Sequence, residues 1–578
     1  MNIIELYRGV IKSLGKSYLF LLLIMLCGLN LMVMHYYVLH TCKIGAVPDI
    51  TILVDNLVSI SFDVIVLFII TYLLTFRKLR IAIILCFIIT WLWSFSTVMY
   101  SRFFFHYLSF SAVCQGNSLF DGLIVNCITA NFRLIDIYYP CVMVLFVLLL
   151  TLCWRKTFLN PLRNLIMVFT LIIVVDFGSY VFYCVSNPPY RYLSCFTHRI
   201  YSNHFVKHLY YSNPKLAHFL RGEIRTIYSE LLNVINGNID LSEHQLSEIK
   251  RLSSDSSNSL CNNFVVPSSK NVIFILVESY MSFTVDMKIE EKEVTPFLNS
   301  LKRNKNVYYN GKMKKNVTIG GSSDGQFIYM TGLLPLRSII TLTKANHVEL
   351  PGLPKYIGRK SRMIIPTTTS IWNQDEMCRQ YGFDSLYARN DYSQELDSCL
   401  TDEQVFELAI QKDKCSSQPF FSVILTGSMH QPYEVQIDST FPIKDTSITD
   451  ELACYLNACH YTDRQIENYF KYLYESGLYD NSLIVIAADH PVDNTDFGGV
   501  CNDIPLFIVN STGLPEKMWE GECNQVDVYT TLLDLLGCKV NWYGLGHSLV
   551  SPKYAYSLST EFWEVSEWII MGDYFSKE

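Results

Sequence analysis

Charged residues are scarce in this sequence. They make up 17% of its 578 residues, and the mean hydropathy of +0.22 is too apolar for a wholly soluble chain. There is no basic tract and the formal net charge is −7, so nucleic-acid binding has no support. None of the 18 cysteines forms a CxxC pair, which argues against a zinc ribbon. No small-residue cleavage site follows the first apolar stretch, so that stretch does not read as a signal peptide.

What the sequence does contain, in its first third, is five long apolar stretches. The predicted spans are residues 17–40, 59–76, 81–100, 138–154 and 164–183. Each approaches the roughly 20 residues that cross about 30 Å of hydrocarbon as a helix. Basic residues gather at the N-terminus and in the second and fourth connections, which places the N-terminus in the cytoplasm and everything past residue 183 outside. Asp63 and Asp176 lie inside spans, so a transport role is a further hypothesis.

The remaining chain predicts a different architecture. After a helical stretch at 223–235 and a polar run at 253–263 that reads as a linker, strand-like and helical patterns alternate. Strands are expected at 271–277, 363–366, 420–426, 483–488 and 504–509, and helices at 295–305, 403–411, 461–476 and 526–536. This alternation indicates one α/β domain with a largely parallel sheet. The expected parts are a five-helix transmembrane domain at 1–184, an extracytoplasmic helical linker at 185–269 and a catalytic domain at 270–578.

Two of the predicted strands end in residues that bind metals. The run NVIFILV stops at Glu278, and LIVIAA stops at Asp489 and His490. In open α/β sheets, ligands bind at the carboxyl ends of the strands, and divalent metals take carboxylate oxygen and imidazole nitrogen. Either residue alone could be a helix cap or a surface group, but together they indicate a metal site.

A candidate nucleophile lies in the segment TIGGSSDGQF at 318–327. Ser322 and Ser323 follow paired glycines and precede a helical pattern at 326–331, where close backbone approach and a helix N-terminus favour an anionic ligand. Metal coordination can activate a serine hydroxyl. A Gly-Ser loop with a helix cap is the alternative reading.

These segments together resemble lipoteichoic acid synthases and related membrane phosphoglycerol and phosphoethanolamine transferases of the alkaline phosphatase/sulfatase superfamily. The stretches NVIFILVES and EVTPFLNSL are similar to the opening of their catalytic domain, and GGSSDGQF is similar to their nucleophile segment, commonly GKTSDxEF. SIWNQDEM, GSMHQPY, HYTDRQIENYF, GLYDNSLIVIAADH and VDVYTTLLDLLG follow in the family's order over nearly all of residues 270–550.

The resemblance implies one divalent ion, Mn²⁺ in preference to Zn²⁺, bound by Glu278, Ser322, Asp489 and His490. It also implies that Ser322 is the catalytic nucleophile. The substrate contacts that it implies are His430 over the phosphate, with a catalytic role, and Trp372 and Gln374 in the headgroup pocket.

Two positions depart from the family's pattern. Ser322 stands in place of threonine and keeps the hydroxyl. Gln374 stands where the synthases often have Arg in WNRD, so the positively charged guanidinium group, with its paired N–H donors, is missing. A sulfatase is disfavoured, because the (C/S)-x-P-x-R motif would need Pro at Asp324 and Arg at Gln326.

The function implied is transfer of a phosphoglycerol headgroup through a phosphoserine intermediate to an extracytoplasmic glycan or lipid. The implied partners are a membrane phospholipid donor, phosphatidylglycerol, and a glycan or glycolipid acceptor. The implied location is the bacterial inner membrane, with the catalytic domain outside the cytoplasm. The alternatives are a phosphoethanolamine transferase acting on lipid A or another glycan, and a membrane receptor built on a decayed enzyme.

Overall fold

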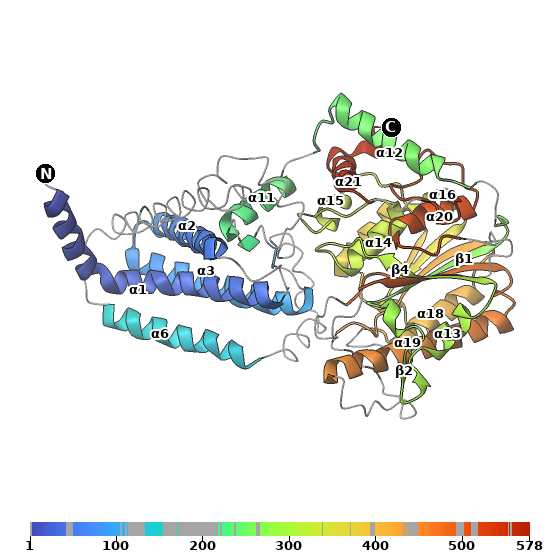
Figure 1. The fold of residues 1–578 in the computed structure, drawn as a ribbon, viewed down its shortest axis with the longest axis horizontal. Helices are drawn as coiled ribbons and strands as arrows, with labels where there is room; N and C mark the ends of the chain where they lie inside the picture. Colours follow the sequence, from blue (N-terminus) through green and yellow to red (C-terminus); the bar gives the residue numbers. More distant parts are fainter. Residues whose placement is uncertain are drawn as a thin grey trace. The chain divides into compact units, whose positions relative to one another are not determined.

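The computed structural model describes residues 3–41, 50–104, 107–109, 113, 133–153, 170, 218–219, 222–235, 238–261, 266–337, 339–369, 371–392, 399–431, 433, 435, 449–492, 502–509, 518–552, 554 and 558–577. The described residues fall into two compact units, one before residue 234 and one from residue 234 onward. Figure 1 colours the elements of both units along the chain.

The first unit is built from long apolar helices. They are α1 (Ile3–Thr41), α2 (Ile50–Leu74), α3 (Leu79–Phe104) and α6 (Tyr138–Cys153), followed by α11 (Glu223–Ile235). Four of these helices, α1, α2, α3 and α6 with its preceding turn, are long and apolar enough to cross a membrane, and they match the first four predicted spans. The fifth predicted span, 164–183, lies outside the described residues, so five helices are not confirmed.

Aromatic side chains form much of the interface between these helices. Phe87 of α3 stacks on Phe146 of α6 with ring centroids 3.7 Å apart, and Phe20 of α1 meets Phe68 of α2 edge-on. Such pairs add to the burial of apolar area. They explain why the helices form a bundle in which one side of each is buried.

Asp63 of α2 caps the N-terminus of α11. Its carboxylate is buried and accepts hydrogen bonds from the backbone N–H groups of Glu223 and Ile224, at 2.7 and 3.2 Å, where α11 begins. A carboxylate at a helix N-terminus satisfies N–H groups that have no partner inside the helix. Asp63 therefore ties α11 to the apolar helices. Asp176 lies outside the described residues, and a transport role stays an untested prediction.

The second unit is an α/β domain around an eight-stranded sheet. Its strands are β1 (Asn271–Val277), β4 (Val307–Lys314), β5 (Lys360–Ile364), β6 (Ser385–Tyr387), β7 (Phe420–Leu425), β8 (Ser482–Ala488), β9 (Ile504–Val509) and β10 (Cys523–Asn524), in the order β10-β4-β9-β8-β1-β7-β5-β6. All neighbouring pairs are parallel except β4 with β9 and β8 with β9. The prediction of a largely parallel sheet is confirmed.

Helices cover both faces of this sheet (Figure 1). On one side lie α14 (Ser322–Thr331), α15 (Leu342–Ala345), α16 (Leu353–Ile357), α20 (Asp527–Leu535) and α21 (Thr560–Gly572), with α12 (Glu243–Asn258) packed on α21. On the other side lie α13 (Pro296–Lys302), α18 (Asp402–Lys414) and α19 (Asp450–Glu475). The central strands β1 and β8 are buried along their whole length, as their continuous apolar runs predict.

Several local predictions were wrong. The run 253–263 was predicted as a linker, but its first half is the end of α12, because the apolar side chains Ile249 and Leu252 give this polar helix a buried side. The strand predicted at 363–366 begins earlier, at Lys360. Strand β4 was missed because its buried residues alternate with more exposed ones, and α19 begins eleven residues before the predicted 461.

Candidate metal and nucleophile site

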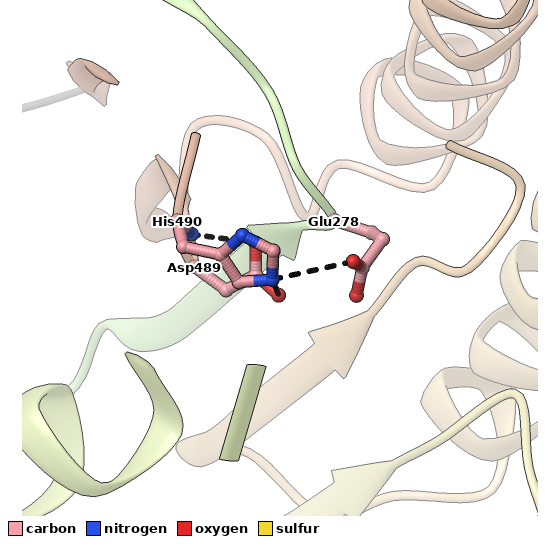
Figure 2. A group of neighbouring side chains, drawn as sticks. All are labelled: Glu278, Asp489 and His490. Atoms are coloured by element: carbon pink, nitrogen blue, oxygen red, sulfur yellow. Dashed lines mark hydrogen bonds and ion pairs between the residues drawn. The ribbon is translucent and has the colours of Figure 1, made fainter. Parts of the chain in front are cut away.

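The site begins where strands β1 and β8 end side by side. The two strands pair in parallel, and their register sets Val277 opposite Ala488. The next residue of each strand, Glu278 and Asp489, must therefore emerge next to the other at the carboxyl edge of the sheet, with His490 one step further. Figure 2 shows the three side chains converging there. One ligand atom from each lies within 4.8 Å of the others.

The His490 ring has a defined tautomer. Its Nδ1 lies 2.9 Å from the carbonyl oxygen of Pro491, which can only accept a hydrogen bond, so Nδ1 carries the proton. The neutral ring then presents a bare Nε2, which lies 3.5 Å from Oε1 of Glu278 and 3.6 Å from Oδ2 of Asp489. An imidazole oriented by its second nitrogen in this way is typical of a metal ligand.

Ser322 completes the cluster from the other layer of the fold. It is the first residue of α14, and its Oγ lies 3.1 Å from Oε2 of Glu278 and 3.1 Å from Nε2 of His490. The preceding residue, Gly321, has a φ of +51°, a backbone conformation that is strained for residues with a side chain. The turn that delivers the hydroxyl therefore depends on a glycine.

The spacing of the four side chains fits a small divalent ion. Donors about 2.0–2.1 Å from a central ion at tetrahedral angles lie roughly 3.3–3.4 Å apart. The donor-to-donor distances given above run from 3.1 to 3.6 Å. Two carboxylates, one imidazole and one hydroxyl form a donor set suited to manganese or zinc.

The electrostatics of the carboxylates also favour a cation. Burial raises the pKa of Asp489 to about 8, and the neighbouring charge of Glu278 adds to that rise. Burial acts in the same direction on Glu278, but the attraction of His490 and His430 outweighs it and lowers the pKa of that carboxyl. Without a cation, the pair thus retains one proton near neutral pH. A divalent ion would displace it.

The loop that leads to Ser322 is organised by Asp324, whose role the sequence analysis missed. This buried carboxylate accepts hydrogen bonds from the Thr318 N–H (2.9 Å), the Thr318 hydroxyl (2.7 Å) and the Gly320 N–H (3.0 Å), and its other oxygen accepts one from the Thr341 hydroxyl (3.0 Å). A local Asp within a Gly-rich loop is a common turn former. That was the signal available in the sequence.

Gln525 is a second residue that the sequence analysis missed. It is fully buried just before α20, and its Nε2 donates to the backbone carbonyl of Asp489 at 2.5 Å. Its Oε1 accepts from the backbone N–H of Asn316 at 3.0 Å, so one side chain joins the strand end of β8 to the segment leading to Ser322. Nothing in the local sequence marks it, because both partners are distant along the chain.

The remaining predicted residues lie around the cluster. His430 is in the loop after β7, where Asp402 accepts hydrogen bonds from the N–H groups of Gly427 (2.8 Å) and Ser428 (2.9 Å). The ring donates from Nδ1 to the Gln431 carbonyl at 2.7 Å, and it is close enough to act on the pKa of Glu278. Trp372 and Gln374 sit at the start of α17 (Gln374–Tyr381). Gln374 is buried and donates from Nε2 to Oε1 of Gln326 on α14 at 2.9 Å.

Known proteins match the α/β unit and, in some comparisons, most of the chain. The family pattern described as Sulfatase matches residues 270–538. Lipoteichoic acid synthase 2 of Bacillus subtilis is 30% identical over 311 residues, covering 49% of this chain and 47% of that protein. Lipoteichoic acid synthase of Staphylococcus saprophyticus is 26% identical over 499 residues, covering 81% of this chain and 74% of that protein. The match thus spans about half the length of the first relative.

One solved structure resembles nearly the whole chain. It is the integral membrane lipooligosaccharide phosphoethanolamine transferase A of Neisseria meningitidis, with a TM-score of 0.51 over 90% of this chain and 95% of that one. The sequence identity is 13%, so the likeness concerns the fold. Apolar helices followed by a sulfatase-like α/β domain are the shared architecture.

Proposed function

The chain is a lipoteichoic acid synthase-like member of the alkaline phosphatase/sulfatase superfamily, and from this premise we propose that it is a metal-dependent phosphotransferase. The group transferred is phosphoglycerol, taken from a membrane phospholipid and passed to an extracytoplasmic glycan or lipid. The observation that carries the proposal is the position of Ser322. Its hydroxyl lies 3.1 Å from both Glu278 and His490, at the N-terminus of α14.

The four donors would bind one divalent ion, for which Mn²⁺ is our proposal. When bound, the ion lowers the pKa of the serine hydroxyl and stabilises charge on phosphoryl oxygens. Glu278, Asp489 and His490 are rigidly oriented for that task, because each is hydrogen-bonded to the backbone or a side chain beside it. Ser279, for example, donates from Oγ to Glu278 at 2.8 Å and from its N–H to Asp489 at 2.8 Å.

The first step that we propose uses these residues. The oxygen of Ser322 attacks the phosphorus of phosphatidylglycerol, a new P–O bond forms, and the bond from phosphorus to the diacylglycerol oxygen breaks. The departing diacylglycerol oxygen takes up one proton in place of the one that leaves the Ser322 hydroxyl, so the step balances, and we propose His430 as the group that donates it. In the second step an acceptor hydroxyl attacks the phosphoserine, and Ser322 is released with its proton restored.

The apolar helices fit this role because the donor lipid stays in the bilayer. A catalytic unit attached to membrane spans works at a high effective concentration of its lipid. We propose that the spans lie in a bacterial inner membrane within residues 1–184, that 185–269 form an extracytoplasmic linker, and that 270–578 catalyse transfer outside the cytoplasm.

The test is a pair of substitutions at one position, assayed with labelled phosphatidylglycerol in membranes. Ser322→Ala should reduce diacylglycerol release by at least about 1,000-fold, because no other oxygen replaces the nucleophile. Ser322→Thr should retain activity, because the hydroxyl is kept. Undiminished turnover by Ser322→Ala would reject the nucleophile, and exclusive turnover of phosphatidylethanolamine would favour the phosphoethanolamine alternative.

A further inference from the structure

The turn after strand β1 is held in a strained conformation. Ser279 has a φ of +51°, which residues other than glycine rarely adopt, and strain of this kind gathers at functional sites. The strained residue serves both carboxylates of the proposed metal site. Its Oγ donates to Oε1 of Glu278 and its N–H donates to Oδ1 of Asp489, each at 2.8 Å. The orientation of both carboxylates therefore depends on the backbone conformation at Ser279.

One hydroxyl closes this turn. The hydroxyl of Tyr455 on α19 donates to the carbonyl of Ser279 at 3.0 Å and accepts from the N–H of Met281 at 3.1 Å. It thus pairs with two backbone groups on either side of Tyr280. All three residues that take part are buried, so the loss of the hydroxyl would leave two buried backbone groups without this partner, which is unfavourable.

The same part of α19 contacts the loop that carries His430. Tyr433 meets the ring of Tyr455 edge-on, with ring centroids 5.5 Å apart, and the N–H of Tyr433 donates to the carbonyl of His430 at 2.9 Å. A second link lies one turn earlier on α19, where Oε1 of Glu451 accepts from Nε2 of Gln431 at 2.6 Å. Residues four apart on a helix share a face, so this face meets both the turn after β1 and the His430 loop.

Helix α19 lies on the side of the sheet opposite α14, the helix that supplies Ser322 (Figure 1). The edge of the sheet is therefore supported from both layers. The proposed transfer needs the metal ligands and His430 at a fixed separation, and a misplacement of about 1 Å can lower a rate roughly 100-fold. A single side chain that contacts both parts is suited to fix that separation.

From these contacts we infer that Tyr455 is a positioning residue for the proposed reaction. Its hydroxyl fixes the turn that orients Glu278 and Asp489, and its ring fixes the loop that presents His430. Tyr455 acts through these neighbours and not on the substrate. The inference rests on the proposed function and specifies how two parts of that site are held in register.

The first test separates the hydroxyl from the ring. Tyr455→Phe keeps the ring, so the affinity for Mn²⁺, measured by isothermal titration, should fall by about 10- to 100-fold, as for other changes to the support of a ligand. At saturating Mn²⁺, its affinity for glycerol phosphate should equal that of the unmodified chain. Tyr455→Leu removes both contacts. It should bind glycerol phosphate at least about 10-fold more weakly even at saturating Mn²⁺, because His430 is no longer held in place.

Tyr469→Phe is the matched control. Tyr469 is also fully buried on α19, but its hydroxyl donates to Oδ2 of Asp413 at 2.8 Å, a carboxylate that is ion-paired with Arg362. Its loss should lower thermal stability, as Tyr455→Phe does, and leave the affinity for Mn²⁺ unchanged. Equal losses of Mn²⁺ affinity in the two variants would indicate a general loosening of α19 and overturn the inference. Unaltered Mn²⁺ affinity in Tyr455→Phe would overturn it as well.

A double-substitution cycle tests the route through Ser279. Ser279→Ala removes the Oγ donor and should itself weaken Mn²⁺ binding. Because Tyr455 acts through Ser279, adding Tyr455→Phe to Ser279→Ala should reduce the affinity by a smaller factor than Tyr455→Phe does alone. Factors that simply multiply would overturn the inference.

These readouts are binding constants, so they distinguish the two proposals. The expected Mn²⁺ results without any cleavage of lipid would reject the proposed function alone. An unmodified chain that binds Mn²⁺ and cleaves phosphatidylglycerol, with Tyr455→Phe unaltered in both, would reject the inference alone. An unmodified chain that binds no Mn²⁺ would overturn both.

Discussion

At the scale of single residues, the site depends on backbone groups that orient its side chains. The Pro491 carbonyl sets the tautomer of His490, and the N–H groups of Ser279 and His490 both donate to Oδ1 of Asp489, at 2.8 and 2.7 Å. Oδ2 of Asp489 is left facing Nε2 of His490. Asp489 and His490 therefore each turn one side-chain atom toward the backbone and another toward the centre of the cluster.

Metal binding at this cluster should release a proton. Burial raises the pKa of Asp489 to about 8, so in the metal-free protein this carboxyl is largely protonated at pH 7, and a bound cation requires the anion. Isothermal titration in buffers of different ionisation enthalpy should show release of about one proton at pH 7 and progressively less above pH 8.

The same shift has a consequence for stability. A carboxyl whose pKa is raised on folding stabilises the metal-free fold at low pH, and this contribution is lost as pH rises from about 4 through 8. Asp489→Asn should remove both the proton release and this part of the pH dependence. Equal proton release by Asp489→Asn would contradict the assignment.

At the scale of elements, the site is made by the close approach of α14 to the end of β8. The hydroxyl of Tyr329 on α14 donates to the carbonyl of Ala488 at 2.7 Å. At Gly325 the helix lies so close that an added Cβ would stand 2.5 Å from the carbonyl oxygen of Asp489 and 2.9 Å from its Cα. A glycine inside a helix normally weakens it, so its presence here is explained by this contact.

Gly325→Ala tests that contact. Alanine in a helix is normally favourable by about 1 kcal/mol, but here the backbone of Asp489 would have to move. We expect lower thermal stability and a metal affinity reduced roughly 10- to 100-fold, as for other changes that displace a ligand's support. Gly28→Ala is the control, since its Cβ would meet the nearest atom at 3.7 Å. Unaltered metal affinity in Gly325→Ala would show that the close approach is not required.

At the scale of the whole molecule, apolar helices precede the α/β unit, and the proposed function requires that unit to lie outside the cytoplasm. The basic residues in alternate connections predict that residues past 183 face the exterior. Two free cysteines of the α/β unit, Cys415 and Cys454, are exposed and can report on this orientation.

A membrane-impermeant maleimide applied to intact cells or spheroplasts should therefore label Cys415 and Cys454, as read by peptide mass spectrometry. Serine at both positions should remove the labelled peptides and serves as the control. Labelling that occurs only after the membrane is permeabilised would reverse the predicted orientation.

Much of this architecture could be predicted from the sequence because the signals are local. Continuous apolar runs predicted the buried strands β1 and β8, and long ones predicted the first four spans. Glu278, Asp489 and His490 could be nominated because they follow continuous apolar runs. Ser322 could be nominated because it follows paired glycines, precedes a helical pattern and lies in a segment that resembles the family's nucleophile segment. The polar helix α12 and the alternating strand β4 have weak local patterns, and these were the elements misread or missed.

Only the tertiary structure decided which of these residues meet. The parallel register of β1 with β8 sets Glu278 beside Asp489, and the packing of α14 brings in Ser322. Gln525 contacts Asp489, which lies 36 residues earlier in the chain, and Gln374 contacts Gln326, which lies 48 residues earlier. No local pattern in the sequence could have indicated these contacts. Residue types and their periodicity determine the helices and strands. Contacts between segments far apart in the sequence depend on how those elements pack, which local sequence patterns do not reveal.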